Sequence, residues 1–80
     1  MLYICRNEQA VAAAKEAGCG PGAGDLLLLI QEAATIDLQG SGVVRAAEDL
    51  AQRGCPWTAD ALDSASIIRL ISEHYRVWVI

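Results

Sequence analysis

The chain has 80 residues, of which 54% are apolar and 20% are charged, and it carries a net charge of −4. A chain of this length makes one domain, which we place at residues 1–80. Its six basic residues form no basic stripe, and no apolar run approaches the roughly 18 residues that cross a membrane, so neither nucleic-acid binding nor membrane insertion is expected.

The first half of the sequence alternates predicted strands and helices. Residues 2–5 form the first predicted strand, and Asn7 is a suitable N-cap for a helix that Gly18 ends. After a glycine-rich connector, residues 26–30 are five consecutive aliphatic side chains without polar alternation. This pattern is typical of a central strand in a parallel sheet with helices on both faces. It predicts a small α/β fold whose functional residues lie at strand ends.

The second half continues the same alternation. The predicted elements are, in order, a short helix or helical turn at 31–38, a strand at 43–46, a helix at 47–53, a helix at 64–74 and a final strand at 76–80. Residues 58–63 are ambiguous, because they suit either a very short strand near Ala61 and Leu62 or the beginning of one long final helix. The sheet is therefore predicted to have four or five strands.

The apolar content predicts a subunit interface. A chain of this length buries only about 60–65% of the surface that it exposes when unfolded. The apolar fraction exceeds what one small core can hide, and association of subunits would cover the remainder. Trp78 lies among the apolar residues of the final predicted strand and is the candidate for such an interface.

The three cysteines, Cys5, Cys19 and Cys55, cannot all pair with one another, which favours a reducing compartment. They include no Cys-x-x-Cys spacing, and a zinc site with the single histidine, His74, would need ligands that meet only by coincidence. We therefore expect neither a metal nor a cofactor. No basic segment precedes the apolar residues at the start of the chain, so we expect a cytoplasmic protein without a signal peptide.

Three segments resemble the DsrH/TusB family of sulfur-relay proteins, within the DsrE-like superfamily, in their order and spacing. They are GDLLLLIQE at 24–32, EDLAQRG at 48–54 and DSASIIRLISEH at 63–74, followed by Trp78. The resemblance runs over nearly the whole chain. It implies a three-layer α/β/α fold around a mostly parallel five-stranded sheet. The chain is shorter than usual members, mainly between Cys55 and Leu62, which leaves the fourth strand in question.

The resemblance also implies a function. Members assemble with DsrE/TusD-like and DsrF/TusC-like subunits and pass persulfide sulfur between proteins, for 2-thiolation of the transfer RNA wobble uridine or for dissimilatory sulfur oxidation. Because the main sulfur-accepting cysteine belongs to the DsrE/TusD-type partner, we expect this chain to be an interaction or scaffold subunit. Two alternatives stay open: a stand-alone persulfide carrier or sulfurtransferase, and a homo-oligomeric α/β domain with an unrelated role.

A persulfide carrier needs an exposed thiol with a lowered pKa, and two cysteines are candidates. Cys5 ends the first predicted strand beside Arg6 and near a helix N-terminus, although it equally suits a buried strand position. Cys19 is flanked by glycines and lies near the place where the DsrH branch often has its own cysteine, although it equally suits an inert loop thiol. Cys55 is expected to be structural.

Overall fold

The computed structural model describes residues 1–18, 24–38, 42–56, 58–74 and 76–80. The elements, in chain order, are β1 (Leu2–Cys5), α1 (Glu8–Glu16), β2 (Leu26–Leu29), the 3₁₀ helix η2 (Gln31–Thr35), β3 (Val43–Ala46), α2 (Ala47–Gln52), β4 (Ala61–Leu62), α3 (Ser64–Glu73) and β5 (Val77–Val79). Their strands form one sheet in the order β4-β3-β2-β1-β5, and every pair is parallel. The predicted α/β class with a small parallel sheet is confirmed.

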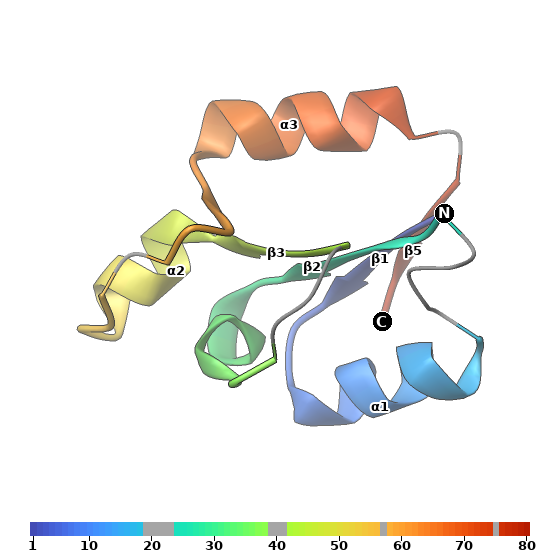
Figure 1. The fold of residues 1–80 in the computed structure, drawn as a ribbon, viewed down its shortest axis with the longest axis horizontal. Coiled ribbons are helices and arrows are strands. Elements are labelled where there is room, and N and C mark those ends of the chain that lie inside the picture. The colour runs from blue at the N-terminus through green and yellow to red at the C-terminus, as the bar shows by residue number, and fades with distance from the viewer. Residues whose placement is uncertain (19–23, 39–41, 57, 75) are drawn as a thin grey trace.

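Helices cover both faces of this sheet. Helix α3 lies over one face, and α1 and η2 lie under the other (Figure 1). Successive residues of β2 point to opposite faces, so Leu27 and Leu29 pack with α1 while Leu28 packs with the α3 side. All three have 4% exposure or less. The predicted burial of β2 at the centre of the sheet is therefore confirmed, and its cause is the aliphatic run that tolerates no water on either face.

Local signals in the sequence set the element boundaries. Asn7 caps α1 by accepting a hydrogen bond from the Ala10 N–H at 2.8 Å. Asp63 caps α3 in the same way through the Ser66 N–H, also at 2.8 Å. Gly54 follows α2 with φ +69°, a left-handed conformation that favours glycine.

The ambiguous residues 58–63 form a short strand and not the start of a longer helix. Ala61 and Leu62 pair with Arg45 and Ala46 of β3. Helix α3 then begins at Ser64, directly after the Asp63 cap. The short β4 closes one side of the sheet, and β5 forms the other. In the described part of the chain, no helix has the length and apolar character needed to cross a membrane.

Candidate functional site

The thiol of Cys5 lies in the core. Its position at the end of β1 turns the side chain toward α1, where it packs with Ala10, Val11 and Ala14. Cys5 has 0% exposure. Helix α1 begins three residues later, as the sequence predicts, but the thiol is on the inner side of the strand and does not reach the surface. A sulfur donor could therefore meet Cys5 only if α1 moved away from the sheet.

The other two cysteines lie in connecting segments. Cys19, the second candidate for persulfide chemistry, lies outside the described residues. Cys55 follows α2, is half-buried and lines a pocket of about 480 Å³ beside the edge of the sheet at β3 and β4. Among the described cysteines, Cys55 is thus the one with access to solvent, although the sequence assigned it a structural role.

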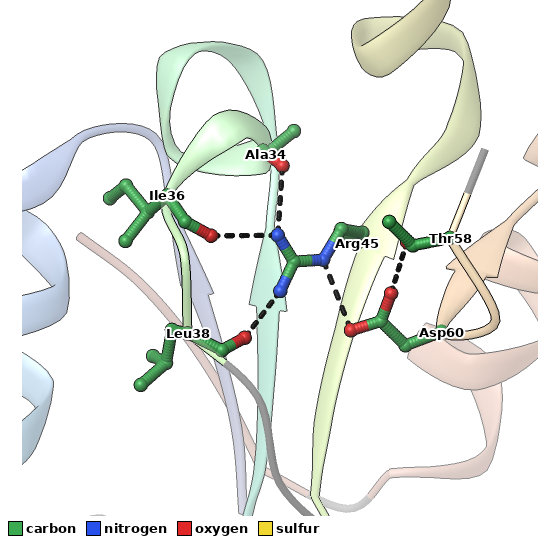
Figure 2. A network of polar contacts seen from close by, with 6 residues as sticks. All are labelled: Ala34, Ile36, Leu38, Arg45, Thr58 and Asp60. Atoms are coloured by element: carbon green, nitrogen blue, oxygen red, sulfur yellow. Dashed lines mark hydrogen bonds and ion pairs between the residues drawn. The ribbon is translucent and has the colours of Figure 1, made fainter. Parts of the chain in front are cut away.

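The pocket that Cys55 lines is built around a buried arginine. Arg45 lies in β3 with 5% exposure, and its guanidinium points toward the end of η2 (Figure 2). Nη1 donates to the carbonyl oxygens of Ala34 at 3.0 Å and Ile36 at 2.8 Å, and Nη2 donates to that of Leu38. Ala34 lies in η2, and Ile36 and Leu38 follow it. The Ile36 carbonyl also accepts from the Leu38 N–H at 2.8 Å, and the arginine supplies a donor to each of the three carbonyls.

An acidic partner balances the charge of Arg45. Nε of Arg45 lies 3.1 Å from Oδ2 of Asp60, and the other carboxylate oxygen of Asp60 accepts from the hydroxyl of Thr58 (Figure 2). The backbone carbonyl of Asp60 also accepts from the Arg45 N–H at 3.1 Å. A buried charge with this many partners ties η2 and the segment before β4 to the sheet. Because the described partners accept from each of its three guanidinium nitrogens, we assign Arg45 a structural role in the pocket wall.

Sequence reasoning missed this network. A signal was available, because Arg45 interrupts the otherwise apolar strand Val43–Ala46. A charged residue inside a buried strand needs acceptors nearby. The sequence did not show that these acceptors are carbonyls from a segment earlier in the chain together with Asp60 from a later one.

The carboxyl ends of the strands carry polar groups that hold the elements together. Gln31, two residues after the end of β2, has φ +52°, a conformation that costs a non-glycine residue about 1–3 kcal/mol. Its N–H donates to Oδ2 of Asp49 in α2 at 2.9 Å. At the same edge, the Ser64 hydroxyl donates to Oε1 of Glu48 at 2.9 Å. The strand ends are therefore occupied by contacts between α2, η2 and α3.

Among the described residues, neither a shifted pKa nor a cluster of ligands singles out a catalytic group. The pKa of Asp63 is lowered, first by its hydrogen bonds from the Ser66 hydroxyl and N–H and then by the charge of Arg69. That shift belongs to the N-cap of α3. The described residues contain no cluster of three metal-ligating side chains. His74 lies at the end of α3, where Nδ1 is 2.8 Å from the Leu70 carbonyl oxygen, so its contact is with the helix terminus.

The largest unexplained feature is an exposed apolar surface at the C-terminal end of the chain. We call it the α3–β5 surface and define it by the exposed large apolar side chains of these two elements: Ile68, Ile71, Val77, Trp78 and Val79. Within it, Val77 and Val79 lie on the face of the sheet that α3 covers, whereas Trp78 lies on the opposite face with Tyr3. Trp78 has 44% exposure although its ring contacts Tyr3, with the ring centroids 5.6 Å apart. Ile68 and Val79 have 66% and 59% exposure.

Comparison with known proteins identifies no relative of this chain. No protein-family model matches the chain, and no curated protein or solved structure has significant similarity to it. The candidate site therefore depends on the geometry described above.

Proposed function

We propose that this chain is an interaction subunit of a cytoplasmic persulfide-transfer complex of the DsrH/TusB kind. In this role it joins DsrE/TusD-like and DsrF/TusC-like subunits and completes their assembly without being the main sulfur acceptor. The observation that carries the proposal is the uncovered α3–β5 surface. Five large apolar side chains remain exposed on two adjacent elements, which is what a protein–protein interface leaves behind when its partner is removed.

The burial of Cys5, one of the two cysteines considered for persulfide chemistry, agrees with a scaffold role. Persulfide transfer requires a thiolate that a second protein can reach. Cys5 has no exposed surface, so it does not meet this requirement in the folded state. The three-layer arrangement and the parallel five-stranded sheet also agree with the fold that the DsrH/TusB resemblance implies.

Two measurements on the same preparation test the proposal. The chain is mixed with purified DsrE-like and DsrF-like proteins, and complex formation is followed by size-exclusion chromatography with light scattering. Separately, it is incubated with a cysteine desulfurase and cysteine, and mass spectrometry looks for the addition of one sulfur atom. We expect a stable complex and no added sulfur.

Cysteine variants separate the alternatives. Loading that disappears in Cys19→Ser or Cys5→Ser, but persists in the control Cys55→Ser, would make the chain a persulfide carrier and overturn the scaffold role. Absence of both complex and loading would favour an α/β domain with an unrelated role. In that case the same light-scattering measurement on the chain alone reports whether it forms homo-oligomers.

A further inference from the structure

The outer edge of β5 is an open strand edge. On its inner side, β5 is bonded to β1: the Leu2 N–H donates to the Arg76 carbonyl at 2.9 Å, and the Ile80 N–H donates to the Ile4 carbonyl at 3.0 Å. In a parallel ladder, alternate residues of a strand bond to the same neighbour. The N–H and C=O groups of Val77 and Val79 therefore point away from β1. No described strand lies on that side, because β5 ends the sheet.

The two edges of the sheet differ in how they are protected. The β4 edge has only two residues, Ala61 and Leu62, and so short a strand offers little backbone for pairing. The β5 edge presents Val77, Trp78 and Val79, which have high β propensity and include no proline, lysine or charge. Only one of the two edges therefore has the composition of a pairing surface.

The charges around β5 indicate the chemistry of the partner. Arg76 precedes the strand, and at its other end the Nε of Arg6 donates to the Ile80 carbonyl at 3.2 Å. The ion pairs among the described residues involve Arg45, Arg53 and the amino group of Met1, and neither Arg6 nor Arg76 takes part. A partner strand with carboxylates at its ends would supply the missing opposite charges.

A second copy of the chain fits this edge less well. In an antiparallel pair centred on Trp78, Arg76 of one copy would lie opposite Ile80 of the other, beside that copy's Arg6. Like charges would then meet at both ends of the pair, which destabilises it. Charge complementarity therefore favours a different strand over self-pairing.

We propose that the β5 edge accepts an extended segment of a partner protein, with apolar side chains at alternate positions and an acidic side chain at each end. The segment adds a sixth strand through the outward N–H and C=O groups of Val77 and Val79, and its apolar side chains pack beside Val77 and Val79 on the face of the sheet that α3 covers. This inference rests on the proposed function as an interaction subunit, because it specifies how that subunit engages its partner.

A peptide probe tests the pairing. The probe is a fluorescein-labelled peptide, Glu-Val-Thr-Val-Thr-Val-Glu, and binding is measured by fluorescence anisotropy at low salt. We expect saturable binding that weakens with added salt, because the end charges are exposed. A peptide with lysine in place of both glutamates should bind about tenfold more weakly. Absence of saturable binding by the acidic peptide, or equal binding of the two peptides, would overturn the proposal.

A matched pair of variants tests the role of the backbone. Val79→Pro removes an outward N–H that β1 does not use, a position where an edge strand tolerates proline. We expect about tenfold weaker peptide binding in Val79→Pro, whereas Val79→Thr, which keeps the N–H, should stay within about threefold of the parent chain. Circular dichroism verifies folding. If Val79→Pro does not fold, a peptide N-methylated at its central valine tests the same bond from the partner side and should bind about tenfold more weakly.

The remaining outcomes test the edge pairing and the sulfur-relay role separately. Equal binding by Val79→Pro and Val79→Thr would overturn the edge pairing. A dimer in sedimentation velocity that Val79→Pro abolishes would make a second copy the occupant and would also overturn it. Peptide binding without assembly with DsrE-like and DsrF-like proteins would refute the sulfur-relay role alone, whereas assembly that Val79→Pro leaves intact would refute the edge pairing alone.

Discussion

The two ends of the chain contribute differently to the molecule. Every buried apolar residue among those described lies between Leu2 and Leu50, in β1, α1, β2, η2, β3 and α2. In the segment from 58 to 80, neither α3 nor β5 has a buried residue, and Ile67 and Leu70 are only half-buried against the sheet. The N-terminal region therefore contains the buried core. The C-terminal region adds α3 over one face of the sheet and β5 at its edge, and leaves apolar side chains exposed.

We expect the largest difference in stability between the two regions when one leucine in each is replaced by alanine. Leu28→Ala removes a side chain with 1% exposure from the central strand, and we expect a loss of about 3 kcal/mol in the free energy of unfolding. Leu70→Ala in α3 removes a half-buried side chain and should cost about 1 kcal/mol. Urea unfolding followed by tryptophan fluorescence measures both. Equal losses in the free energy of unfolding would show that α3 is packed as tightly as β2, and would contradict the difference between the two regions.

Removal of the buried arginine should have an effect of similar size. Arg45→Met removes the hydrogen bonds from the guanidinium to the carbonyls of Ala34, Ile36 and Leu38 and leaves the Asp60 carboxylate without its opposite charge, at a cost of about 2–4 kcal/mol. The control is Arg53→Met, because Arg53 forms an exposed pair with Asp49 at 3.9 Å and should contribute less than about 0.5 kcal/mol. Thermal unfolding by calorimetry compares the two variants, and similar melting temperatures would contradict the assigned role of Arg45.

The two helix caps should differ in their response to pH. Asn7→Ala removes an uncharged cap from α1, so we expect a loss of about 1 kcal/mol that does not change with pH. Asp63→Asn keeps the cap of α3 but removes its charge. Because the folded state lowers the pKa of Asp63 below 3.8, the carboxylate stabilises the fold above that value, and this contribution is lost as the pH falls through the folded-state pKa.

Chemical denaturation between pH 7 and pH 2 checks this prediction. The stability of Asp63→Asn should lie below that of the parent chain at neutral pH and approach it in acid. A deficit that stays constant over this range would mean that the charge of Asp63 contributes nothing, and that only the geometry of the cap matters.

The smallest effect on stability is expected on the α3–β5 surface itself. Ile68 has 66% exposure, so Ile68→Ser should change the free energy of unfolding by no more than about 0.5 kcal/mol. The same variant should weaken assembly with DsrE-like and DsrF-like proteins, measured by light scattering. A large loss of stability would show that the side chain serves the fold and not an interface.

Particular residues show how far sequence reasoning reaches. The caps at Asn7 and Asp63 and the helix end at Gly54 depend on neighbours within a few positions of the chain, and the sequence predicted the Asn7 cap and the Gly54 end. It left residues 58–63 open between a short strand and the start of a longer helix, and pairing with β3 decided for the strand. The role of Cys5 was left open, because a strand end suits both an exposed and a buried thiol. Packing of α1 over β1 decided its burial.

The sequence by itself determined the central position of β2 and the order of helices and strands apart from β4, because periodicity, capping and aliphatic runs are local properties of the chain. The tertiary structure decided which strand edge remains open, which arginine enters the core and which apolar residues stay exposed. Each of these depends on contacts between segments far apart in the sequence, such as Arg45 with Asp60 and β1 with β5. The free energies of these long-range contacts depend on how the whole chain folds, so they cannot be evaluated from any one segment.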